Sequence, residues 1–122
     1  MHSSIRRAAR SLLRSGAFTA TATHDLGPGA MDGYDALLIH YVVTSYATGN
    51  VTIKVSAIAD APGSRFLACD NAAWTTSAIS SNAQGTLIVN APLPSDILVT
   101  LTGASTPGMS LAVYVEKVKT GH

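Results

Sequence analysis

The stretch that decides the fold is YDALLIHYVVTSYATGNVTIKVSAIAD, residues 34–60. Two segments in it, residues 36–43 and 50–59, are rich in β-branched, aromatic and other apolar residues, which is typical of β-strands. Between them stands ATGN, which has the small and turn-forming residues of a tight connection. In the second segment valine and isoleucine alternate with polar residues, so one face of the strand is apolar. These features predict two strands joined by a short turn.

Strand-like segments also occur on both sides of this stretch, at residues 17–24, 85–90, 95–103 and 110–118. Glycine- and proline-containing sequences separate them, among them GASTPG before the last strand. No helical pattern interrupts these strands, so we expect antiparallel pairing instead of βαβ units. The prediction for residues 17–122 is an all-β antiparallel β-sandwich, jelly-roll-like or Ig-like. Alternation predicts these residues in or near its core: Val51, Ile53, Val55, Leu111, Val113 and Val115.

The segment of residues 36–43 differs from the others because it is apolar on both faces. Such a pattern is typical of a central strand that is covered on both sides. His40 interrupts it, and a histidine inside a strand is more often a half-buried residue with satisfied hydrogen bonds than a metal ligand. We therefore expect a central strand here, with a cover over its outer face.

Composition sets the limits on the function. The chain has 122 residues, enough for one domain with its own core, and 47% of them are hydrophobic while only 12% are charged. The charged share is about half the usual one, which indicates a surface that neighbouring subunits cover. Cys69 is the single cysteine, so no disulfide can form within the chain. No apolar run approaches the ~20 residues of a membrane-spanning helix, and we expect no membrane association.

The sequence SSIRRAARSLLRSG, residues 3–16, has a different character. Its apolar residues recur at the spacing of one helical face, and Gly16 stands where a helix would end. We predict a short amphipathic basic helix within residues 3–15, in a separate arm of residues 1–16. The first 14 residues carry four arginines and no acid, whereas the rest of the chain carries four basic and seven acidic residues. The residues expected at a contact made by this arm are Ile5, Arg6, Arg7, Arg10, Leu12, Leu13 and Arg14.

Three interpretations of the arm remain open from composition alone. An arginine- and serine-rich start without acids is typical of a mitochondrial transit peptide. A basic amphipathic segment can also lie on an anionic membrane or on nucleic acid, although this one has no aromatic residue for stacking. The third interpretation is favoured: the apolar residues pack on the chain's own body or on a neighbouring subunit, and the arginines pair with acidic groups there.

No constellation in the sequence predicts catalysis. The four histidines lack metal-ligand spacing, there is no Gly-x-Ser-x-Gly motif, and His24 beside Asp25 lacks a nucleophile in a recognisable context. MDGYD, residues 31–35, is interpreted as a turn because it lacks the ligand pattern of a calcium loop. We expect no enzymatic activity, no cofactor and no metal. Trp74 is expected in core or interface packing; the alternative is a carbohydrate-binding module in which it would stack on a sugar.

The order of these segments resembles a known family over residues 15–116. SGAFTATATHDL, DGYDALLIHYVVTSYATGNVTIKVSAIAD and GTLIVNAPLPSDILVTLTGASTPGMSLAVYVE resemble the small β-sandwich structural proteins of tailed bacteriophages. The resemblance implies a non-enzymatic virion component, made in the host cytoplasm, that decorates or cements the capsid. Alternatives are a head-to-tail junction or tail component. The implied partners are the major capsid protein or other virion subunits and further copies of the chain, with a trimer as one arrangement; nucleic acid is disfavoured.

Overall fold

The computed structural model describes residues 5–7, 10–26, 31, 33–61, 64–89 and 97–120, and every regular element among them is a β-strand. All strand pairings are antiparallel, which confirms the predicted class. These residues contain no helix that is long and apolar enough to cross a membrane. The strands are β1 (Ile5–Arg7), β2 (Ser11–Arg14), β3 (Ala17–Phe18), β4 (Ala22–Asp25), β5 (Ala36–Ala61), β6 (Ser64–Thr75), β7 (Ala83–Val89) and β8 (Ile97–Thr120).

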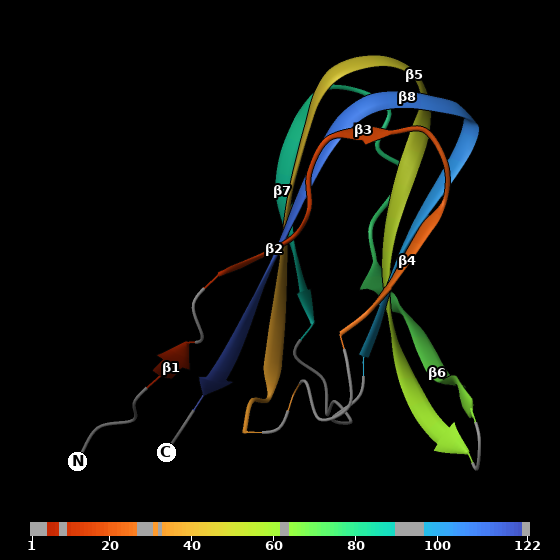
Figure 1. Ribbon diagram of the computed structural model, residues 1–122. Helices are drawn as coiled ribbons and strands as arrows, with labels where there is room; N and C mark the ends of the chain where they lie inside the picture. Colours follow the sequence, from red (N-terminus) through yellow and green to blue (C-terminus); the bar gives the residue numbers. More distant parts are fainter. Residues whose placement is uncertain are drawn as a thin grey trace.

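Two long strands, β5 and β8, organise the sheet. They have 26 and 24 residues and pair with each other from Ala36 and Val118 at one end to Ala57 and Ile97 at the other. Figure 1 shows that both strands bend over together at the top of the molecule and then run down on two sides. By hydrogen bonding the eight strands are one sheet, and this sheet is folded onto itself.

The bend divides the sheet into two halves. The half that we call the arm half contains residues 36–44 of β5 and 109–120 of β8, with strand order β2, β8, β5, β7. In this half β1 and β3 also pair with β8. The distal half contains residues 50–61 of β5 and 97–104 of β8, flanked by β6 and β4. Inward side chains from both halves belong to one hydrophobic cluster.

The core confirms the predicted alternation. The segment of residues 36–43 is central as expected, because it pairs with β7 on one side and β8 on the other. Trp74 in β6 is 5% exposed and belongs to the core cluster, so core packing is confirmed and the ring offers no open face to a sugar. The six residues predicted for the core are at most 5% exposed: Val51, Ile53, Val55, Leu111, Val113 and Val115.

The turns predicted at ATGN and GASTPG are wrong, because β5 and β8 run through both sequences without ending. Instead, each strand bends, and the register of their pairing shifts between Thr44 and Asn50. The two bends are bonded to each other: Thr48 pairs with Gly108, and the Thr48 hydroxyl donates a hydrogen bond of 2.7 Å to the carbonyl of Thr106. Because the partner strand bends at the same level, each strand keeps its partner and does not turn back on itself.

The helix predicted within residues 3–15 is wrong for the residues that the structure describes. Residues 5–7 and 11–14 are strands on the edge of β8, and residues 3, 4, 8 and 9 lie outside the described part. A helix of about 12 residues is marginal in water, whereas the edge of β8 offers unpaired N–H and C=O groups. Pairing with that edge bonds the backbone of the arm and lets Leu13 pack against the core.

Replacing Gly49 with alanine tests the paired bends. Gly49 has φ of +75°, and a Cβ atom there would lie 2.6 Å from the Pro107 Cα atom and 2.7 Å from the Ala104 carbonyl oxygen. Left-handed backbone costs an alanine about 1–2 kcal/mol, and a clash with backbone typically adds about 1–3 kcal/mol. We therefore expect Gly49→Ala to lower the free energy of unfolding by about 3 kcal/mol in urea titrations.

Gly33→Ala is the matched control. Gly33 has a similar φ of +85°, but no atom lies within 4 Å of the position of its Cβ atom. Gly33→Ala should lower the free energy of unfolding only by the cost of left-handed backbone, about 1–2 kcal/mol. Equal losses in the two variants would contradict the close approach of the two bends.

Candidate functional site

The arm lies along one edge of the arm half. In β1, Arg7 pairs with Val118, and in β2, Leu12 pairs with Tyr114. A bulge follows Leu12, so that Leu12 and Leu13 have different surroundings. The Leu13 side chain is partly buried and packs against the core, whereas Leu12 is 56% exposed. The arm is therefore attached to the chain's own body and still presents an apolar residue to the outside.

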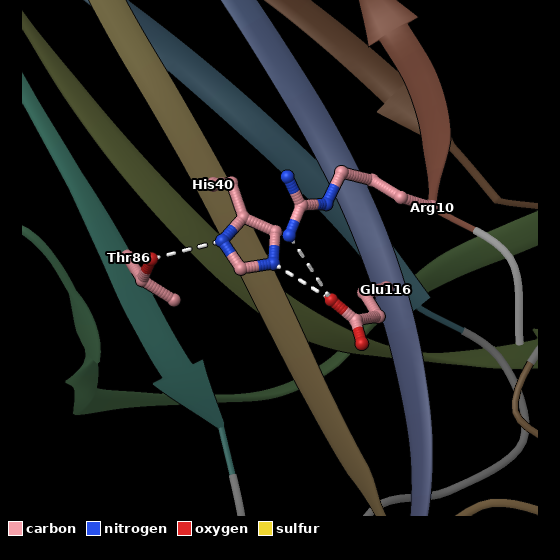
Figure 2. Close-up of polar contacts among 4 residues, drawn as sticks. All are labelled: Arg10, His40, Thr86 and Glu116. Carbon is pink, nitrogen blue, oxygen red and sulfur yellow. Dashed lines mark hydrogen bonds and ion pairs between the residues drawn. The ribbon is translucent and has the colours of Figure 1, made fainter. Parts of the chain in front are cut away.

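A buried carboxylate lies on the outer face of the arm half, next to the arm. Figure 2 shows one carboxylate oxygen of Glu116, in β8, in contact with both His40 of β5 and Arg10, which immediately precedes β2. Glu116 Oε1 lies 3.0 Å from His40 Nε2 and 3.6 Å from an Arg10 guanidinium nitrogen. Only 6% of the Glu116 side chain is exposed, and a carboxylate so deeply buried requires charged or hydrogen-bonding partners. The arm contributes one of these partners.

His40 extends this set of polar contacts from Glu116 to β7, on the other side of β5. His40 Nδ1 lies 2.9 Å from Thr86 Oγ1 of β7. Because a carboxylate only accepts, the His40 ring donates from Nε2 to Glu116, and its Nδ1 is hydrogen-bonded to the Thr86 hydroxyl. This set of polar groups thus connects the arm with β8, β5 and β7. His40 is half-buried with satisfied ring nitrogens, as predicted.

Arg14 fixes the end of β2. Its guanidinium lies 5.2 Å from the centroid of the Phe18 ring and donates a hydrogen bond of 2.8 Å to the Ala17 carbonyl. Phe18 is fully buried in the core, so this cation–π contact joins the arm to the core.

Burial, and secondarily the charge of Arg14, lower the pKa of His24 in β4. The His24 imidazole is therefore neutral at pH 7.

The structure separates the predicted contact residues into groups. Ile5, Arg6 and Arg7 form β1, of which the structure describes the backbone. Arg10 reaches the buried Glu116, and Arg14 reaches Phe18. Arg10 therefore pairs with an acidic group of the chain's own body, as in the favoured interpretation of the arm.

MDGYD, residues 31–35, forms a turn in the part that the structure describes. The Tyr34 amide donates to the Met31 carbonyl at 2.9 Å, as expected for a turn, while Asp32 lies outside the described residues. Asp35 forms an exposed ion pair of 3.8 Å with Lys119. Within the described ranges, no group of three or more His, Cys, Asp and Glu side chains could hold a metal ion.

Sequence reasoning did not predict the contact between His40 and Glu116. The two residues are 76 positions apart, and only the pairing of β5 with β8 brings them together. The available signal was that each interrupts the outer face of an otherwise apolar strand. Two such interruptions on neighbouring strands favour a mutual contact, but the register of the strands has to be known first.

The chain matches no family model and no curated protein. A solved structure of Bacillus endospore appendages, described as a novel family of disulfide-linked pili, contains a chain with a similar fold. The two chains have a TM-score of 0.55 and 15% sequence identity, and the match covers 100% of this chain and 93% of the appendage chain. At this identity the similarity extends to the fold alone, and it agrees with the all-β architecture.

Replacing His40 with leucine tests the buried cluster. The variant leaves the Glu116 carboxylate buried without its imidazole donor, and removing one partner of a buried pair costs about 3–5 kcal/mol. We expect His40→Leu to lower the free energy of unfolding by about 3 kcal/mol, measured by urea titration. Adding Glu116→Leu should recover most of this loss. Lys119→Met, which breaks an exposed pair, is the control and should cost under about 1 kcal/mol. A loss in His40→Leu no larger than in the control would contradict the role of this cluster.

Proposed function

We propose that this chain is a non-enzymatic structural subunit that assembles in many copies and contacts a neighbouring subunit through its N-terminal arm. In this proposal the folded sheet is a β-sandwich module. The function that we favour for the chain is a capsid decoration or cement protein of a tailed bacteriophage. The family resemblance of residues 15–116 supports the assignment to a virion. The low charge of the chain, 12% of residues, supports a surface that other subunits cover.

The observation that carries the proposal is the exposure of Leu12 on the arm. Leu12 is 56% exposed, stands between Arg10 and Arg14, and borders a hollow of about 200 Å³ that Leu13 and Leu26 also line. Burying such a side chain contributes roughly 1.5–3 kcal/mol, whereas an exposed arginine pair contributes under about 1 kcal/mol. Individually weak contacts of this kind become strong when many copies attach together. The arm thus suits a multi-copy assembly.

A second candidate is the subunit of a pilus-like filament. The fold neighbour comes from endospore appendages described as disulfide-linked pili, and its chain has the same overall fold. This chain has one cysteine, so each copy could form one disulfide to another copy at most. A covalently continuous row needs two bonds per subunit, and we therefore favour non-covalent contacts in either kind of assembly.

Replacing Leu12 with aspartate tests the proposed role of the arm. Tagged variants are added to purified virions, and the measured quantity is the number of copies retained per particle over a range of concentrations. Loss of 1.5–3 kcal/mol corresponds to an affinity that is about 10- to 150-fold weaker. Arg10→Gln should weaken binding less than about fivefold and reduce its salt dependence.

Two features make this experiment specific. Leu12 is exposed, so its replacement leaves the fold intact, whereas Leu13 packs against the core and is unsuitable as a test position. Thr23→Asp, at an exposed position of β4, is the matched control and should bind like the unaltered chain. Unchanged attachment of Leu12→Asp, or absence of the chain from purified particles, would contradict the virion assignment. Filaments formed by the purified chain alone would favour the second candidate.

A further inference from the structure

Among the described strands, the arm half ends in two edge strands that pair on one side and that differ from each other. One edge is β2 and the other is β7, with β8 and β5 between them. Because each neighbouring pair is antiparallel, β2 and β7 run in opposite directions. A second copy placed beside the first without rotation would therefore bring its β2 against β7 in an antiparallel arrangement.

The β7 edge lacks the usual protection against pairing. Natural edge strands often carry charges, prolines or bulges that disfavour pairing with another strand, as β2 does with Arg14 and its bulge. The sequence of β7, AQGTLIV, contains no charge and no proline, and its register with β5 is continuous from Val89 to Ala83. Among the described strands, β7 is hydrogen-bonded to β5 alone. Its other side therefore pairs with no strand of the described part, and a strand can be added to such an edge.

Both edges present an exposed apolar side chain. Leu12 on β2 is 56% exposed and Ile88 on β7 is 58% exposed. On the outer face, the strand register aligns Leu12 with Tyr114, His40 and Thr86 in one row across the four strands. Ile88 lies on the same face in the next row along the strands. If the rows continue into a second copy, the two side chains become diagonal neighbours within contact range.

The charges favour pairing between unlike edges. The arm carries Arg10 and Arg14, so two β2 edges would bring arginines together. The exposed outer residues of β7 are uncharged: Gln84, Thr86 and Ile88. Pairing of β7 with a second β7 would cover Ile88 but leave Leu12 exposed. Pairing of β2 with β7 covers both and opposes no like charges.

We propose that the partner of the arm is the β7 edge of a second copy of this chain, joined by antiparallel extension of the sheet. This inference rests on the proposed function, because it names the neighbouring subunit that the arm contacts. Such a contact uses two different surfaces, so it repeats from copy to copy and produces rings or open-ended rows. The assembled sheet buries Leu12 of one copy beside Ile88 of the next.

A complementation experiment tests this arrangement with the full chain. Leu12→Lys blocks the β2 edge and leaves β7 intact, while Ile88→Lys blocks β7 and leaves β2 intact. Sedimentation velocity is measured for each variant and for an equimolar mixture, at a concentration at which the unaltered chain assembles. Each variant alone should sediment as a monomer, and the mixture should form dimers and nothing larger. Thr102→Lys, at an exposed position of the distal half, should assemble like the unaltered chain.

The other outcomes separate this inference from the proposed function. Dimers of Leu12→Lys alone, with no added association in the mixture, would show pairing of two β7 edges and overturn the inference. Assembly that persists in Ile88→Lys but is lost in Leu12→Lys would show that the arm binds elsewhere, which overturns the inference and keeps the arm as a contact. An unaltered chain that remains monomeric at all concentrations overturns the inference, whereas the virion assignment is decided by attachment to particles. Circular dichroism of each variant establishes that it is folded.

Discussion

The hydrogen-bonded contact between the two bends, in residues 44–50 of β5 and 104–108 of β8, is the constraint on which the rest of the structure depends. At this point Thr48 donates to the carbonyl of Thr106, and Gly49 lets the backbone of β5 approach Pro107. The bends fold a ribbon of paired strands without interrupting its pairing, and both halves then share one core. Burial of apolar side chains between the halves is the main stabilising contribution, and it requires both strands to bend at the same level.

The outer face of the arm half holds a connected set of polar groups that extends from Arg10 through Glu116 and His40 to Thr86. Residues 36–43 lie in the centre of this half, and the cover expected over their outer face is contributed in part by the arm through Arg10. Glu116 is costly to bury, but His40 and Arg10 offset that cost and fix the arm relative to β8 and β5. The result is a sheet whose first edge is built from the arm and whose last edge is the unprotected β7. We propose that a chain with this construction makes repeated contacts with further copies of itself.

The parts that could be predicted from the sequence depend on local periodicity. Alternation in residues 51–55 and 111–115 assigns inward side chains whatever the partners of the strands are. The continuity of β5 and β8 could not be predicted, because ATGN and GASTPG form bends only when they are paired with each other over almost 60 positions. The arm was predicted as a helix since its apolar spacing fits a helical face, but the edge of β8 provides a backbone partner that a short helix lacks. The pairing of His40 with Glu116 likewise follows from register and not from any motif.

Native-state hydrogen exchange of the backbone amides tests the central claim most directly. If the paired bends make the folded ribbon one cooperative unit, amides in the arm half, at residues 37–43 and 111–115, and in the distal half, at residues 51–55 and 97–101, should exchange only by global unfolding. Their opening free energies should then agree with each other and with the value from urea denaturation. A distal half that exchanges by a separate opening of lower free energy, while the arm half remains protected, would contradict the account.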